Sequence, residues 1–175
     1  MPFLDVMHAY FRGERIEALY FIVPIGVVMV AFAAVTLRAE RGGFAWGLAV
    51  PLVLFGLFAI GIGAAVGLRT TGQVAAIDAG FQSDPGAMVA EELPRMRKVN
   101  DNWPIYIGMW TALTLVGLGL RFGLKVEWAH GVGPAIILIG ALGFLIDGFA
   151  ERRARPYTEA LEILEAEHRI ELGAE

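Results

Sequence analysis

The stretch ALYFIVPIGVVMVAFAAVTL, residues 18–37, decides the fold because no charged side chain interrupts it. A helix needs about 20 apolar residues to cross the ~30 Å hydrocarbon core of a bilayer. Three further runs are similarly apolar, at residues 44–68, 103–120 and 128–149. Backbone groups in lipid must find their hydrogen-bond partners within the segment, so each run is expected to be helical. The sequence therefore predicts an all-α integral membrane protein, a bundle of four transmembrane helices.

Composition agrees with a membrane location. Hydrophobic residues make up 57% of the 175-residue chain, and the mean hydropathy is +0.60, which is too high for a soluble domain of this length. The four runs are apolar on all sides, unlike the one-sided pattern of a surface helix. Tryptophans near the ends of the runs are typical of interfacial anchors: Trp46, Trp103, Trp110 and Trp128.

Positive charge is distributed unevenly along the chain. If the chain crosses a membrane four times, its N-terminus, residues 69–102 and its C-terminal tail share one side. Most of the 14 Lys and Arg residues fall on that side. The opposite side holds only Arg38, Arg41, Arg121 and Lys125. By the positive-inside rule, we expect both termini in the cytoplasm. The bias of the composition toward Ala, Gly, Leu and Arg is typical of the cell (inner) membrane.

Segments outside the spans also show helical patterns. Residues 2–15 carry an apolar stripe, which predicts an interfacial N-terminal helix that Gly13 separates from the first span. The cytoplasmic loop 69–102 is expected to hold short helices, with starts at Asp84 and Pro94. We divide the chain into a transmembrane domain, residues 1–155, and a cytoplasmic amphipathic tail, residues 156–175.

The tail has one apolar face and one acidic face. A helix that begins at Pro156 would place its apolar side chains together: Tyr157, Leu161, Leu164 and His168. The acidic face argues against flat binding to an anionic membrane. The apolar face is a candidate contact for a protein partner or another copy, and folding back onto residues 69–102 is the open alternative.

Polar side chains gather at the cytoplasmic boundary of the spans. Asp147 lies about one turn from the end of the fourth span, where burial of a charge requires a partner. Arg69 is the predicted partner, because Glu151 lies one turn further on and repels Asp147. The expected polar ring is either a structural belt of ion pairs or a ligand site, and it comprises Arg15, Glu17, Arg69, Asn102, Asp147 and Glu151.

Small residues recur at helical spacing within the spans. Such residues let two helix backbones approach closely and promote association in lipid. The sequence does not distinguish packing within one bundle from packing between copies. The candidates for helix packing are Ala59, Gly63, Gly67, Gly119, Gly123, Gly133 and Gly140.

Several kinds of chemistry are excluded or disfavoured. The chain has no cysteine, which excludes disulfides, thiolate metal sites and cysteine nucleophiles. We predict no metal site, no cofactor and no nucleic-acid partner, since no compact basic patch with stacking aromatics is present. The middle of the spans offers only Thr36, Thr111 and Thr114 as polar side chains. Proton-coupled transport normally needs a carboxylate or amine at that depth.

No motif in the chain defines a reaction. We therefore expect a non-catalytic integral membrane subunit that scaffolds or stabilises a larger membrane complex. A small oligomeric channel or passive transporter is the alternative. A membrane enzyme or lipid-binding protein that uses the polar ring is the third possibility, so the pattern favours a non-catalytic protein without excluding an enzyme. The expected partners are the lipid bilayer and either another protein or further copies of this chain.

Overall fold

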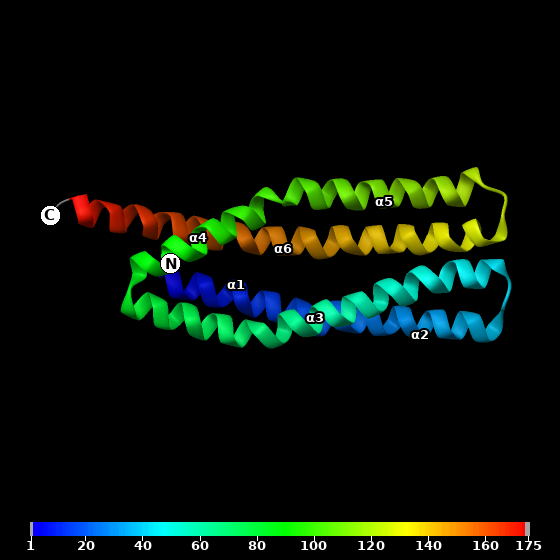
Figure 1. Ribbon diagram of the computed structural model, residues 1–175, viewed down its shortest axis with the longest axis horizontal. Coiled ribbons are helices and arrows are strands. Elements are labelled where there is room, and N and C mark those ends of the chain that lie inside the picture. Colours follow the sequence, from blue (N-terminus) through cyan, green and yellow to red (C-terminus); the bar gives the residue numbers. More distant parts are fainter. Residues whose placement is uncertain (1, 174–175) are drawn as a thin grey trace.

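Every regular element in the computed structural model, which describes residues 2–173, is a helix (Figure 1). Side chains are described up to residue 170. A five-residue π-helix, η1, joins the first two α-helices into one continuous rod. In chain order the elements are α1 Phe3–Glu17, η1 Ala18–Ile22, α2 Val23–Ala39, α3 Gly43–Ser83, α4 Pro85–Asp101, α5 Trp103–Gly123 and α6 Glu127–Gly173.

The molecule is elongated, and its two ends differ in chemistry. Both termini lie at one end, together with α4, while the short connections α2–α3 and α5–α6 lie at the other (Figure 1). We call the first the charged end: α1, residues 69–83 of α3, α4 and residues 150–170 of α6. The remaining helices, η1, α2, residues 43–68 of α3, α5 and residues 127–149 of α6, form the apolar half.

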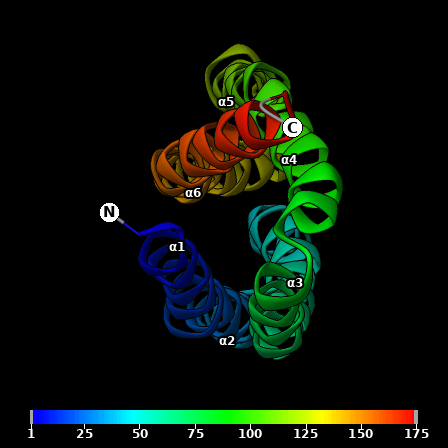
Figure 2. The same cartoon turned by 90° about the vertical axis from the view of Figure 1, so that its left-hand side faces the viewer.

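Four helices are long and apolar enough to cross a membrane, which confirms this part of the sequence prediction. Their order is an open row, with α2 packed on α3, α3 on α6, and α6 on α5 (Figure 2). The apolar stretch in Pro85–Gly123 is by far the least buried of the four, at 6%. Helix α5 is therefore covered on one side only.

Glycines set the closest helix contact in the apolar half. At Gly131 of α6, a β-carbon would collide with the Phe44 carbonyl oxygen of α3 and would lie 2.7 Å from the Leu48 nitrogen. At Gly47 of α3, a β-carbon would collide with the Trp128 carbonyl oxygen of α6. Backbone therefore meets backbone where these two helices cross, as small residues permit.

The charged end has its own hydrophobic core. Side chains from α1, α3, α4 and α6 meet there, and α1 also packs along α3 and α6. The ring of Tyr10 stacks on that of Tyr157 with 4.9 Å between centroids. The largest fully buried side chains in this core are Met7, Phe11, Leu93, Met96, Tyr157 and Leu161.

The expectation that Gly13 separates the N-terminal helix from the first span is wrong. Helix α1 does not end at Gly13 but continues through η1 into α2. Its apolar side chains, including Met7 and Phe11, are buried against α4 and α6 rather than exposed for a lipid surface. The sequence showed an amphipathic helix correctly, but α4 and α6 supply the apolar partner that was assigned to the membrane.

Residues 69–102 form two helices and almost no loop. Helix α3 continues from the apolar half to Ser83, because no residue in 69–83 prevents helical geometry. The start of α4 is as predicted, since the Asp84 carboxylate accepts a hydrogen bond from Ala87 N at 2.9 Å. The second predicted start is wrong, because Pro94 lies inside α4.

The C-terminal tail does not begin a new helix at Pro156. Helix α6 continues across this residue from the apolar half into the charged end. A proline inside a helix removes one backbone hydrogen bond and usually bends or ends the helix. Here the buried neighbours Ala154, Tyr157 and Leu161 hold the helix against the charged-end core on both sides of the proline.

Candidate functional site

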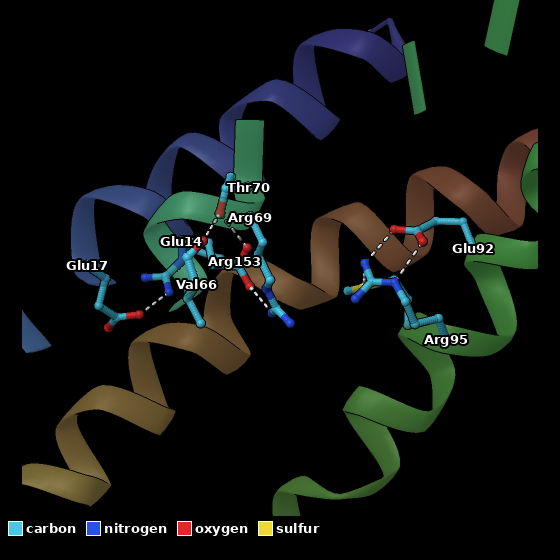
Figure 3. Close-up of polar contacts among 9 residues, drawn as sticks. Glu14, Glu17, Val66, Arg69, Thr70, Glu92, Arg95 and Arg153 are labelled. Atoms are coloured by element: carbon cyan, nitrogen blue, oxygen red, sulfur yellow. Dashed lines mark hydrogen bonds and ion pairs between the residues drawn. The ribbon is translucent and has the colours of Figure 1, made fainter. Parts of the chain in front are cut away.

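Ion pairs join the helices where the charged end meets the apolar half (Figure 3). Glu14 of α1 lies 3.6 Å from the Arg69 guanidinium of α3 and accepts a hydrogen bond from Thr70 Oγ1 at 3.4 Å. Glu17 at the end of α1 accepts a hydrogen bond from Arg153 of α6. These contacts connect α1 to α3 and to α6.

The predicted pair between Arg69 and Asp147 is not formed. Asp147 points toward α5, where its carboxylate accepts a hydrogen bond from Trp110 Nε1 at 2.5 Å. Glu151 pairs with Arg155 along the same helix. Sequence gave the position of each group along its helix but not the direction in which it faces.

The remaining members of the predicted ring have separate roles. Arg15 lines a cavity between α1 and α3. Asn102 sits at the junction of α4 and α5, where its carbonyl oxygen accepts backbone hydrogen bonds from Ile105 and Tyr106. The six predicted residues therefore have different partners and do not surround one common site.

A cavity of about 670 Å³ opens between α1 and α3, and we call it the α1–α3 cavity. At one end His8 Nε2 lies 3.0 Å from Asp78 Oδ1. The wall combines charged, hydroxyl and apolar side chains from both helices and from η1: Phe11, Arg12, Arg15, Ile16, Leu19, Tyr20, Thr70, Thr71 and Val74. Its wall is more polar than those of three other depressions beside the apolar half, which lie next to Leu37, Phe21 and Trp110.

A second cavity, of about 520 Å³, lies between the α1–α2 rod and α6. Its walls are mostly apolar, with Phe21 and Phe149 among the lining residues. The Arg153 side chain lies across Gly13, where a β-carbon would collide with it, and so reaches Glu17. The cavity is therefore mostly apolar, and its charged lining residues, Glu17 and Arg153, form an ion pair with each other.

The charged end also contains a buried polar cluster that was not predicted from the sequence. Glu92 of α4 is 8% exposed, and its carboxylate accepts hydrogen bonds from Arg95 at 2.7 and 2.5 Å and from the Tyr157 hydroxyl at 3.0 Å. Hydrogen bonding to Glu92 raises the pKa of Arg95. The sequence does contain a signal for this burial: Glu92 is four residues from both Met88 and Met96 and therefore falls on the same helical face.

Two tyrosines of this core resist ionisation. Burial raises the pKa of Tyr10 to about 12, with the charge of Glu14 adding to the shift. Burial and then the charge of Glu92 raise the pKa of Tyr157. In both cases the folded protein favours the neutral phenol, because the phenolate would lose its hydration.

Alkaline pH should therefore open the charged end. The pKa of Tyr10 in the fold, about 12, lies above its ordinary value of 10.0. Its contribution to stability is complete below pH 10 and is lost as the pH rises toward 12, since the unfolded chain ionises first. Tyrosinate absorbance and helix content, followed against pH, should change together in this range. Tyr10→Phe should move the loss of helix upward in pH, whereas Tyr20→Phe, on an exposed ring, should leave it unchanged.

The residues proposed for partner contact on the tail lie mostly against their own chain. Tyr157 and Leu161 are fully buried by α1 and α4, so the expectation that they contact a partner is wrong. Leu164 is half-buried beside the same core. The ring of His168 lies against Gly86, where a β-carbon would collide with it. The alternative, in which the tail folds back onto residues 69–102, describes the structure.

The small residues divide into two groups. Most of them lie at contacts between helices: Ala59 is buried, and β-carbons at Gly63, Gly67, Gly133 and Gly140 would meet Ala18, Leu19, Gly117 and Thr114, respectively. Gly119 and Gly123 of α5 are different. A β-carbon at either position would have nothing within 4 Å. These two glycines face away from the rest of the chain.

Comparison with known proteins gives no relative from which a function could be transferred. No protein family, no curated protein and no solved structure matches the chain. Among the described residues, no group of three or more His, Asp or Glu side chains is placed to hold a metal ion. Function is therefore inferred from the geometry of this chain alone.

Proposed function

We propose that this chain is a non-catalytic integral membrane subunit that stabilises a larger complex in the cell membrane, with both termini in the cytoplasm. The four apolar helices support the membrane location. The concentration of Lys and Arg at the charged end supports the orientation. The charged-end core supports a rigid subunit, because it fastens the cytoplasmic extensions of the helices together.

The outer face of α5 is the observation that carries this proposal. Helix α5 lies at the edge of the row and packs on α6 (Figure 2). Gly108, Gly119 and Gly123 all have open space where a β-carbon would be. Elsewhere in the apolar half, glycines such as Gly47 and Gly131 are used for close helix contact. The face of α5 thus has the same surface character as the internal contacts but no helix against it.

The spacing of these residues suits one transmembrane helix of a partner subunit. Gly108 and Ala112 are four residues apart, as are Gly119 and Gly123, and the two pairs are about three helical turns apart. All four are exposed. Such small-xxx-small pairs allow two backbones to pack closely in lipid, where the hydrophobic effect gives no driving force.

The alternatives receive less support. The hydroxyls of Thr36, Thr111 and Thr114 donate to carbonyl oxygens of their own helices, at 2.9, 2.8 and 2.9 Å. One copy therefore offers few polar groups for a channel wall, and a channel would need several copies joined through the same α5 face. Catalysis at the boundary would need a free acid or base, but Glu14, Glu17 and Glu151 are paired.

Gly119→Leu should remove the chain from its complex while leaving the chain itself folded. A leucine at this position fits the isolated protein but prevents close approach by a partner helix. We would extract the tagged protein gently from its own membrane and record native mass spectra of both forms. The wild type should appear with different subunits at fixed stoichiometry, and Gly119→Leu should appear mainly as the free chain.

Gly61→Leu is the matched control, because Gly61 of α3 also has nothing within 4 Å of a β-carbon. It should keep the complex intact. A wild-type spectrum that contains only multiples of this chain would refute the subunit proposal and favour the channel. A complex that survives Gly119→Leu would refute the assigned face.

A further inference from the structure

The arginines at the charged end are mostly neutralised within the chain. The exceptions are Arg12, Arg15 and Arg152, whose guanidinium groups make no hydrogen bond or ion pair with the other residues that the structure describes, and of these only Arg12 and Arg15 belong to α1. Arg12 and Arg15 line the α1–α3 cavity, and Arg152 does not. The neutralised arginines and their partners are Arg69 with Glu14, Arg95 with Glu92, Arg97 with Glu162 and Glu165, Arg153 with Glu17, Arg155 with Glu151, and Arg169 with Glu165.

The guanidiniums of Arg12 and Arg15 lie one turn apart on α1. Like charges at this spacing repel each other and weaken a helix slightly. Across the cavity, α3 presents the hydroxyls of Thr70 and Thr71. Thr70 already donates to Val66 O at 2.7 Å, so Thr71 is the hydroxyl with a free donor. Two cations and a hydroxyl thus face one space with no anion of the chain bound between them.

The acidic groups near this space are occupied. Asp78 is paired with His8 at the far end of the cavity. Glu14, on the same helix as the two arginines, is directed to Arg69 and Thr70. Asp78 is the one carboxylate among the lining residues, and Arg12 and Arg15 outnumber it, so the cavity keeps a net positive charge.

The other part of the wall is apolar and leads into the apolar half. Ile16, Leu19 and Tyr20 line it, and the last two belong to the π-helix η1. Leu19 is seated over Gly67 of α3, where a β-carbon would collide with it. Single π-helical turns occur frequently at functional sites. Here Leu19 and Tyr20 of the turn line the same cavity as Arg12 and Arg15.

We propose that the α1–α3 cavity binds the phosphate-bearing headgroup of an anionic glycerophospholipid. Arg12 and Arg15 bind the phosphate through charge-assisted hydrogen bonds, and Thr71 donates a further one. Ile16, Leu19 and Tyr20 contact the start of the acyl chains. The second cavity, beside Arg153, lacks this chemistry because its arginine is already paired with Glu17.

Lipid competition on the purified full-length chain tests this site. Native mass spectrometry would count bound dioleoyl phosphatidylglycerol against dioleoyl phosphatidylcholine, both added to the delipidated protein. The wild type should retain phosphatidylglycerol preferentially. The double variant Arg12→Gln and Arg15→Gln should lower this preference roughly tenfold, since each basic residue near a membrane surface attracts anionic lipid appreciably.

Lys98→Gln with Arg152→Gln is the matched control. It removes the same charge from two residues that also lack a partner among the described residues but lie outside the cavity. The control should keep the wild-type preference, and an equal loss in both double variants would overturn the proposal in favour of general attraction. Helix content by circular dichroism should be the same in all three proteins, because the substituted side chains are exposed.

Inorganic phosphate and glycerol phosphate separate a lipid site from a site for a soluble anion. Neither should displace phosphatidylglycerol at concentrations comparable to that of the lipid, because they make no contact with Leu19 and Tyr20. Displacement by either anion at such concentrations would overturn the assignment to a lipid. This test does not depend on the α5 face, so it can succeed or fail independently of the proposed subunit role.

Discussion

Gly131→Ala is expected to destabilise the helix bundle by about 3 kcal/mol, at the upper end of the usual range for overpacking. The added methyl group would collide with the Phe44 carbonyl oxygen and would lie 2.7 Å from the Leu48 nitrogen. Both atoms are backbone, so no side-chain rotation relieves the clash. The helices α3 and α6 must separate. This weakens the contact that joins the α2–α3 pair to the α5–α6 pair.

Steric trapping of the purified chain in bicelles would measure the free energy of unfolding. Gly119→Ala is the control, because a β-carbon there meets nothing within 4 Å. Replacing glycine with alanine at an open helical position should stabilise the chain by up to about 1 kcal/mol. If the two substitutions shift stability equally, the close crossing of α3 and α6 is incorrect.

A second substitution at the same crossing distinguishes a local clash from a shift of the whole helix. In Gly47→Ala the added methyl group lies on α3 and would collide with the Trp128 carbonyl oxygen of α6. Once one methyl group has forced the helices apart, the other should find part of the space it needs. We expect the Gly47→Ala and Gly131→Ala double variant to lose less stability than the sum of the single losses.

These glycines show what the sequence reveals and what it hides about helix packing. Gly43 and Gly47 are four residues apart, as are Gly119 and Gly123. The spacing identifies both pairs as suitable for close contact. Only the fold shows that α6 covers Gly47, while nothing in the described chain covers Gly119. The choice depends on the order of the helices, which spacing within one helix does not encode.

The order and rotation of the helices also explain why the predicted partner of Asp147 was wrong. Hydropathy places Asp147 near the last residues of the fourth apolar run, and in the structure it lies close to the point where α6 passes from the apolar half into the charged end. Its partner depends on rotation about the helix axis, which turns it toward Trp110 rather than Arg69. The predicted end of the second apolar helix at residue 68 was too early for a related reason. Residues 69–83 have no apolar run, yet packing against α1 keeps them helical. Local patterns predicted the apolar helices, and tertiary contacts determined the rest.

Arg95→Met should destabilise the charged end by about 3 kcal/mol, because it leaves the buried Glu92 carboxylate without its cation. The Tyr157 hydroxyl would remain as a donor at 3.0 Å, but one neutral hydrogen bond does not replace a two-point ion pair. The loss should be local to α4 and the part of α6 beyond Pro156. Hydrogen exchange of amides in these segments should accelerate about a hundredfold, since each 1.4 kcal/mol corresponds to a factor of ten.

Arg97→Met is the control for this substitution. Arg97 also lies on α4 and pairs with Glu162 and Glu165, but its side chain is 49% exposed. Exposed pairs contribute about 0.5 kcal/mol, so exchange should hardly change. Adding Glu92→Gln to Arg95→Met should recover much of the lost stability, because the amide still accepts from Tyr157 and carries no charge. If the double variant is as unstable as Arg95→Met alone, packing of the arginine stem, rather than the uncompensated carboxylate, holds the charged-end core together.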